Sequence, residues 1–171
     1  MKLDSLTEVL LLVVNHKNVE NYLELGVEYG FNFCDISKKC KKSVGVDIIN
    51  NLKSELPENA EFFLGTTDEF FAQNEKFFDL ILIDAGHSHE NSLRDFLNSI
   101  NFLSKDGIIL MHDTYPLDES YTDNSLCGEV YKTVLYIKEN FYNDFEFFTF
   151  PFHPGITILK KISRKKQVSW Q

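Results

Sequence analysis

Acidic side chains, two histidines and two threonines follow several of the most apolar runs in the sequence. Carboxylates bind cations, accept hydrogen bonds from ribose hydroxyls or hold divalent metal ions, and a histidine can take a proton from a hydroxyl. Capping of a following helix is the alternative role for an aspartate. Capping explains Asp68 but accounts less well for Asp113, after which a loop is expected. The residues concerned are Glu24, Asp47, Thr66, Thr67, Asp68, Asp84, His87, His112 and Asp113.

The segment YLELGVEYGFNF, residues 22–33, contains two glycines separated by three residues. Gly26 directly follows an apolar run, where it lets the backbone turn sharply and approach a ligand, and Gly30 lets the next helix pack close to the strand. Asp47 follows Gly26 after about twenty residues, a spacing at which a carboxylate binds ribose hydroxyls. Together these three residues predict a nucleoside-containing cofactor.

The charge around the glycines narrows the choice of cofactor. A dinucleotide-binding loop has the pattern Gly-x-Gly-x-x-Gly, and its backbone N–H groups bind pyrophosphate. Here Glu24 precedes the first glycine and Glu28 follows it, and both carboxylates would repel a pyrophosphate. They favour a ligand with ammonium and sulfonium charges, such as S-adenosylmethionine, over a nicotinamide dinucleotide.

Strand and helix patterns alternate along the chain and position these residues. Strands are expected over residues 20–26, 42–48, 60–65, 77–86 and 106–113, and a hairpin over 144–150 and 155–161. Helices are expected over residues 5–16, 31–40, 50–56, 67–74, 90–105 and 128–141. Asp4 or Ser5 is the expected cap of the first helix, Pro57 is expected to end the third, and the fifth is expected to bury one apolar face. That face comprises Leu93, Phe96, Leu97, Ile100 and Leu103.

Five almost entirely apolar strands separated by helices predict a parallel sheet covered on both faces. The terminal hairpin adds an antiparallel strand, so the expected fold class is α/β, a Rossmann-like doubly wound sheet that is mostly parallel. No linker or repeat divides the chain, and one domain over residues 1–171 is expected. Such sheets bind ligands beyond the carboxyl ends of their strands, where the acidic residues are expected to gather.

The overall composition excludes some classes of function. A net charge of −9 argues against nucleic acid as the main partner. The apolar run over residues 9–14 is too short to span a bilayer and lacks the features of a signal peptide. Three cysteines without zinc-binding spacing predict reduced thiols in a cytoplasmic protein. The basic cluster over residues 160–166 is interpreted as a solvated end.

Five segments of the sequence resemble class I S-adenosylmethionine-dependent methyltransferases. They are YLELGVEYGF, VGVD, GTTDEFF, the long run from FDLILIDAGHSHE to ILMHDTYP, and CGEVYK, in family order over about residues 20–135. The similarity is greatest to a small bacterial group, methyltransferase domain 24-like, whose members often act on sugars or natural products. The terminal hairpin also fits the sheet order of that family.

The resemblance implies a role for each matching residue. Glu24 and Gly26 would lie beside the methionine part of the cofactor, and Asp47 would hold the ribose. The adenine would be bordered by Thr66, Thr67 and Asp68. Asp84 would lie near the transferred methyl group. Glu28 departs from the family pattern, in which many members have glycine at this position.

Methyl transfer to a hydroxyl requires a base and a site that excludes water. His87 is the candidate base, with Asp84 beside it, and a loop histidine bonded to backbone is the alternative interpretation. His89 is expected to be more exposed. Asp84, His112 and Asp113 are expected to meet at adjacent strand ends, where they either hold a divalent ion such as Mg²⁺ or only shape the pocket.

These inferences favour an O-methyltransferase that acts on a small molecule or a glycan hydroxyl. The alternative is a cofactor-binding, methyltransferase-like module without catalysis that acts through a partner chain. Because no separate substrate-binding cap is visible, a homo-oligomer that completes the acceptor site is also considered. The polar segment over residues 114–128 either closes over the substrate or is a plain surface excursion.

Overall fold

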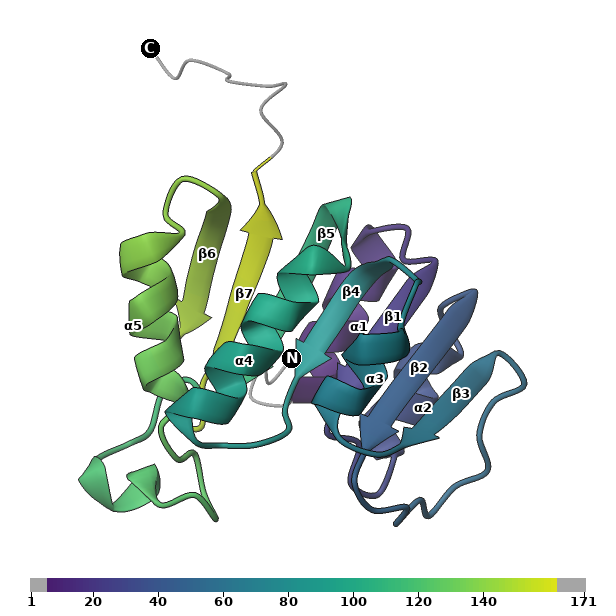
Figure 1. Ribbon diagram of the computed structural model, residues 1–171, viewed down its shortest axis with the longest axis horizontal. Coiled ribbons are helices and arrows are strands. Elements are labelled where there is room, and N and C mark those ends of the chain that lie inside the picture. The colour runs from purple at the N-terminus through teal and green to yellow at the C-terminus, as the bar shows by residue number, and fades with distance from the viewer. Residues whose placement is uncertain (1–5, 163–171) are drawn as a thin grey trace.

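The computed structural model describes residues 6–162, which form a seven-stranded sheet with helices on both faces (Figure 1). The strands are β1 (Asn21–Leu25), β2 (Lys42–Asp47), β3 (Ala60–Leu64), β4 (Phe78–Ile83), β5 (Leu103–His112), β6 (Phe145–Phe150) and β7 (Ile156–Lys161). The helices are α1 (Leu6–His16), α2 (Phe31–Ser37), α3 (Thr67–Gln73), α4 (His89–Asn101), α5 (Val130–Asn140) and the short 3₁₀ helix η1 (Glu119–Thr122).

The strand order is β3-β2-β1-β4-β5-β7-β6. The first five strands are parallel, and β7 runs antiparallel to both β5 and β6. The predicted doubly wound sheet with a C-terminal hairpin is therefore confirmed. The order reverses between β1 and β4, because the chain continues from β1 to one side and from β4 to the other. This switch point opens a crevice at the carboxyl ends of the two strands.

Two layers of helices bury the sheet (Figure 1). Helices α1 and α2 cover one face, where Leu10 and Phe33 pack with Tyr22 and Leu80. Helices α3, α4 and α5 cover the other, where Phe70, Phe96 and Ile137 pack with alternate residues of the same strands. Since both faces of β1 and β4 are covered, nearly every residue of these strands is buried. This rigid centre holds the ends of β1 and β4 in fixed positions.

The helix predicted over residues 50–56 is wrong, because this segment is irregular. It runs beside the segment that follows β1, where the Lys53 N–H donates to the Tyr29 carbonyl at 3.0 Å. Leu52 and Leu56 pack on the α1 and α2 side of the core. A seven-residue helix is marginal on its own, and here tertiary contacts favour an extended path.

Helix α4 is shorter than predicted, but most of its predicted apolar face packs on the core, where Phe96 is buried and Leu93 and Ile100 are half-buried. It ends at Asn101, so Leu103 belongs to β5, and Leu97 is 37% exposed. The buried positions of α4 include Phe96 together with polar residues. These polar residues are Ser92, Asp95 and Ser99. The apolar periodicity therefore predicted the buried face only in part. Ser92 and Asp95 are buried because their side chains form hydrogen bonds with Thr133 and Thr67.

Two sequence predictions concern the ends of the chain. The expected caps of α1, Asp4 and Ser5, lie outside the described residues, as does the basic cluster beyond Ile162. Among residues 6–162, no helix is both long and apolar enough to cross a membrane.

Candidate cofactor site and active site

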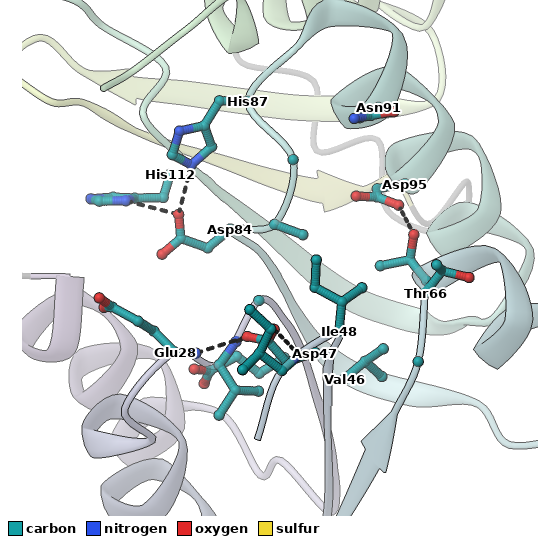
Figure 2. Close-up of a pocket in the computed structure, with 18 of the residues that line it drawn as sticks. Glu28, Val46, Asp47, Ile48, Thr66, Asp84, His87, Asn91, Asp95 and His112 are labelled. Carbon is teal, nitrogen blue, oxygen red and sulfur yellow. Dashed lines mark hydrogen bonds and ion pairs between the residues drawn. The ribbon is translucent and has the colours of Figure 1, made fainter. Parts of the chain in front are cut away.

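A cavity of about 720 Å³ lies at the carboxyl ends of β1, β2 and β4 (Figure 2). Its size is typical of a small-molecule site. The predicted site residues that line it are Glu24, Gly26, Asp47, Thr66, Thr67, Asp68, Asp84, His87, His112 and Asp113. Gly30 is not among the lining residues. The acids at the ends of neighbouring strands thus share one cavity.

The two glycines have different surroundings. Gly26 has φ +84°, and a Cβ atom there would lie 2.0 Å from the Asp84 carbonyl oxygen. The end of β1 therefore comes so close to the end of β4 that only glycine fits. Gly30 has φ +80°, but a Cβ atom there would meet the tip of the Leu52 side chain. Gly30 shapes the start of α2, next to the cavity rather than in it.

Asp47 holds the segment after β1 in place. One carboxylate oxygen, Oδ2, accepts hydrogen bonds from the backbone N–H groups of Val27 and Glu28, both at 2.9 Å. The other oxygen accepts from the Ile49 N–H at 3.0 Å. These bonds support the unusual backbone of Glu28, whose φ is +50°. A carboxylate has about four acceptor positions, so Asp47 retains capacity for a ligand hydroxyl.

Glu24 is a buried carboxyl group at the floor of the cavity. It is 2% exposed and accepts a hydrogen bond from the Tyr22 hydroxyl. Burial raises the pKa of Glu24 to about 8; the Tyr22 bond acts against this rise, and the nearby Asp84 charge adds to it. A buried acid without a cationic partner is costly to ionise, so Glu24 favours a positively charged ligand.

Replacement of Glu24 by glutamine is expected to stabilise the ligand-free protein most at high pH. Between about pH 4.5 and pH 8 the unfolded chain loses the Glu24 proton while the folded protein keeps it. Stability therefore falls as pH rises through this window and levels off above it. The unfolding temperature of Glu24→Gln should exceed that of the wild type by about 5 °C or more at pH 8, and by much less at pH 5. An equal difference at both pH values would contradict this account.

The far end of the cavity combines exposed apolar and hydroxyl side chains. Ile48 and Ile49 are 67% and 55% exposed and line the cavity. Thr66 caps α3 by accepting from the Glu69 N–H, and the Glu69 carboxylate accepts from the Thr66 N–H. An exposed isoleucine beside a helix N-terminus suits a nucleobase, which is flat and partly polar. Sequence reasoning missed both isoleucines, although their position directly after Asp47 was a usable signal.

Two acids and two histidines cluster at the ends of β4 and β5. Figure 2 shows three of them, Asp84, His87 and His112. The His87 Nε2 atom lies 3.2 Å from Asp113 Oδ2 and 4.0 Å from Asp84 Oδ1. The His112 Nδ1 atom lies 3.1 Å from Asp84 Oδ1 and 3.5 Å from Asp113 Oδ2. Asp113 has φ +58°, a left-handed conformation that an aspartate tolerates better than most residues. The predicted convergence of Asp84, His112 and Asp113 is therefore observed, and His87 joins them.

The charges of this cluster are coupled. Burial would lower the pKa of His112, but its hydrogen bonds and charge interactions with Asp113 and Asp84 raise it to about 10. Burial raises the pKa of Asp84, against the opposing effect of His112. Burial also acts to raise the pKa of Asp113, yet His112 and then His87 lower it below its ordinary value. A cationic His112 thus serves as counter-ion to the two carboxylates at neutral pH.

A group of three residues in this cluster has the geometry to hold a metal ion. Potential ligand atoms of Asp84, His87 and Asp113 all lie within 4.8 Å of one another. The sequence predicted His112 as the third ligand, whereas the structure brings His87 into this position. His89 points elsewhere, because its Nδ1 atom lies 2.9 Å from the Thr133 hydroxyl.

The segment over residues 114–128 is anchored at its start to the loop between β6 and β7, and at its end to the His87 backbone. The Tyr115 N–H donates to the Pro154 carbonyl at 2.8 Å, and the Glu129 N–H donates to the His87 carbonyl at 2.7 Å. Gly128 packs so closely on the His87 backbone that a Cβ atom would clash with it. Leu117 and Leu126 remain 64% and 45% exposed. The segment thus begins directly after Asp113 and ends against the backbone of His87.

The sheet order, the terminal hairpin and the cavity at the switch point are those of the class I methyltransferase fold. A family model described as a methyltransferase domain matches residues 23–114. This match spans more than half of the chain, which therefore belongs to that family. The match begins in β1 and ends just after Asp113, so it includes every predicted site residue.

Solved structures share this fold at low sequence identity. An O-methyltransferase from Bacillus cereus in complex with SAH aligns with a TM-score of 0.73 and 14% identity, over 91% of this chain and 80% of that one. TomG, an O-methyltransferase of tomaymycin synthesis from Streptomyces achromogenes in complex with SAM, gives 0.72 and 12%, over 92% and 79%. The N-methyltransferase NodS from Bradyrhizobium japonicum gives 0.62 and 13%, over 92% and 94%. No curated protein sequence matches significantly.

Proposed function

We propose that this protein is an S-adenosylmethionine-dependent methyltransferase that methylates a hydroxyl of a small molecule or glycan. The observation that carries the proposal is the shared cavity of Glu24, Asp47 and Asp84, with His87 and Asp113 at one end. The methyltransferase family and the cofactor complexes of the similar structures support the choice of cofactor. The acceptor atom is inferred from the site, because similar structures include both O- and N-methyltransferases.

Residues along the cavity match the successive parts of this cofactor. At the buried end of the cavity the Asp84 carboxylate provides negative charge, and binding of the ammonium and sulfonium groups would favour ionisation of Glu24 beside it. Asp47, which already fixes the glycine segment, has acceptor capacity for the ribose hydroxyls. Ile48 supplies an apolar surface for the adenine ring. S-adenosylmethionine contributes an electrophilic methyl group bound to a sulfonium.

His87 is placed to take the proton of the acceptor hydroxyl. Its ring lies at the open side of Asp84, and its Nε2 atom is 3.2 Å from the Asp113 carboxylate. Asp113 orients the ring and stabilises the imidazolium that forms when the hydroxyl loses its proton. The anchored segment over residues 114–128 would border the acceptor, and its exposed leucines would help to exclude water.

The same cluster fits a divalent cation. Two carboxylates and one imidazole are a suitable donor set, although an imidazole favours a softer ion than Mg²⁺. In a second version of the mechanism, Asp84, His87 and Asp113 would hold the ion, and the ion, in place of His87 as base, would orient and acidify the acceptor hydroxyl. His112 competes for the same carboxylates as a cation, which limits the affinity of the site for metal.

The metal version of the mechanism predicts that chelation lowers the methyltransferase activity at least tenfold and that added Mg²⁺ or Mn²⁺ restores it. Asp113→Ala removes a carboxylate of the cluster, so its residual activity should no longer respond to EDTA or metal. Steady-state rates with and without EDTA measure both effects. A wild-type rate that is indifferent to EDTA and to both ions would remove the metal from this proposal.

The proposed function is tested by ligand-dependent stabilisation followed by turnover. S-adenosylmethionine and S-adenosylhomocysteine should raise the unfolding temperature, and NAD should not. Release of S-adenosylhomocysteine should then depend on a hydroxyl compound from a panel of phenols, sugars and natural-product alcohols. Stabilisation by NAD alone would overturn the assignment of the cofactor. Turnover only with amines would overturn the assignment of the acceptor.

A further inference from the structure

The Asp113 carboxylate, which orients His87 in the proposed function, must itself be held in place. Asp113 is 8% exposed and has the left-handed backbone described above. His87 and His112 both contact the same carboxylate oxygen, Oδ2. Two contacts at one oxygen do not fix the plane of the carboxylate, and a reacting group needs its orientation fixed by further hydrogen bonds. The source of that further support lies in a part of the chain to which the proposed function gives no role.

Cys127, at the end of the segment over residues 114–128, bonds to this carboxylate. It is 2% exposed, and its thiol forms a hydrogen bond with the Asp113 side chain. A thiol ordinarily keeps its proton at neutral pH, and burial, followed by the charge of Asp113, raises the pKa of Cys127 further. The S–H group is therefore the donor and the carboxylate is the acceptor.

His153, in the loop between β6 and β7, lies against Cys127. The His153 Nδ1 atom is 3.8 Å from the Cys127 Sγ atom. The His153 ring also contacts Tyr121 of η1 edge to face, with the ring centroids 4.3 Å apart. Because the thiol proton is directed at Asp113, a proton on Nδ1 would bond to the sulfur, which is a weak acceptor. His153 and Cys127 thus form a chain of donors that ends at the Asp113 carboxylate.

The same loop supports the backbone next to Asp113. The Thr114 N–H donates to the Gly155 carbonyl at 3.3 Å. Gly155 has φ +91°, and a Cβ atom there would lie 2.3 Å from the Tyr115 backbone nitrogen. The loop therefore approaches the residues after Asp113 so closely that only glycine fits. Backbone contacts and the His153 side chain hold the same short stretch of chain.

We infer that Cys127 and His153 are positioning residues, which fix the Asp113 carboxylate against His87 from the loop between β6 and β7. The inference deepens the proposed function and rests on it, since it assigns roles in the methyl transfer proposed above. The residues that line the cofactor cavity include neither Cys127 nor His153. Both therefore act through Asp113 on the rate of transfer and leave the affinity for the cofactor unchanged.

Two substitutions of Cys127 test the contact with Asp113. Cys127→Ala removes the donor and should lower kcat about tenfold, because a displaced carboxylate no longer orients His87 toward the hydroxyl. Cys127→Ser keeps a donor, so its kcat should stay within about threefold of the wild-type kcat. The affinity of both variants for S-adenosylhomocysteine, measured by calorimetric titration, should equal that of the wild type. Cys40→Ala is the matched control with unchanged kcat, because Cys40 precedes β2 at the end of the sheet opposite the cavity.

His153→Phe tests the contact between His153 and Cys127. The phenyl ring can keep the contact with Tyr121 but has no Nδ1 atom, so kcat should fall about threefold to fivefold. Added to Cys127→Ala, this substitution should cause no further loss, because His153 acts on Asp113 through the Cys127 sulfur. Steady-state rates at saturating cofactor and acceptor measure kcat for the two single variants and the double variant.

The possible results separate this inference from the function on which it rests. If the wild type methylates no hydroxyl compound, the proposed function fails and the inference fails with it. If the wild type is active, an unchanged kcat in Cys127→Ala, or an equal loss in Cys127→Ser, overturns the inference alone. Losses that multiply in the double variant would also overturn it. Should Cys127→Ala not fold, His153→Phe decides, because His153 is exposed, and an unchanged kcat in that variant would contradict the inference.

Discussion

Replacement of Gly26 by alanine is expected to weaken S-adenosylhomocysteine binding at least a hundredfold. The φ angle of +84° alone costs an alanine about 1–2 kcal/mol. The new Cβ atom would also lie 2.0 Å from the Asp84 carbonyl oxygen and 2.8 Å from the Ala85 Cα atom. These are backbone atoms of a buried strand end, so relief of the clash must separate β1 from β4. Calorimetric titration measures the loss of affinity.

Gly30→Ala provides the contrast for this prediction. Gly30 has nearly the same φ, +80°, but its Cβ atom would meet only the flexible tip of Leu52. We expect a loss of about 1–2 kcal/mol in unfolding free energy, with much weaker effects on binding than those of Gly26→Ala. Equal losses of affinity in the two variants would show that close approach of β1 and β4 is not what the site requires.

His87→Ala is expected to lower kcat by about 10²–10⁴-fold, the usual contribution of a general base. The affinity for S-adenosylhomocysteine should change less than threefold, because the ring lies closer to Asp113 than to Asp84, the acid assigned to the cofactor. Rates at saturating cofactor and acceptor, together with a binding titration, measure the two quantities separately. The loss should be largest for acceptors whose hydroxyl has a high pKa.

His89→Ala is the matched control for His87→Ala. His89 lies two residues further along the chain, and its ring faces Thr133 and Tyr136 rather than the cavity. The kcat of His89→Ala should stay within threefold of the wild-type kcat. A His87→Ala variant that is fully active, or one whose activity excess divalent metal restores, would contradict the role of His87 as base. The second outcome would assign His87 to metal binding.

The order and type of most elements could be predicted because local and global preferences agree in them. The apolar runs that became β1, β4 and β5 are buried on both faces, so their composition alone identified a covered parallel sheet. The segment over residues 50–56 shows the limit. Its helical composition was overruled by packing of Leu52 and Leu56 against the core, and by a backbone bond to Tyr29.

The site was predictable where a residue lies at the end of a strand or next to it, as Glu24, Asp47 and Asp84 do. The geometry of a parallel sheet then places the side chain without further information. Thr67 and Asp68 in the first turn of α3 were predicted because they follow β3 closely, but residues further along a helix gave no comparable signal. Asp95 lies within an amphipathic run, and whether its carboxylate faces solvent or a cavity depends on how α4 is rotated against α3. That rotation is set by tertiary packing, which no local pattern encodes.

The sequence also could not predict which side chains of the cluster at the ends of β4 and β5 contact one another. The choice between His87 and His112 as third member of the carboxylate group depends on the loop path after β4, where Gly128 and Glu129 contact the His87 backbone. These contacts join segments about forty residues apart. The position of residues at strand ends predicts where such a cluster lies. It does not predict which histidine joins the two carboxylates.

The central claim is that the acids ending β1, β2 and β4 surround one adenosyl cofactor. A crystal structure of the protein saturated with S-adenosylhomocysteine tests it most directly. The expected density runs from the amino acid moiety beside Glu24 and Asp84 to the ribose at Asp47 and the base over Ile48. Density for the ligand elsewhere, or this cavity filled by protein side chains at saturating ligand, would contradict the account.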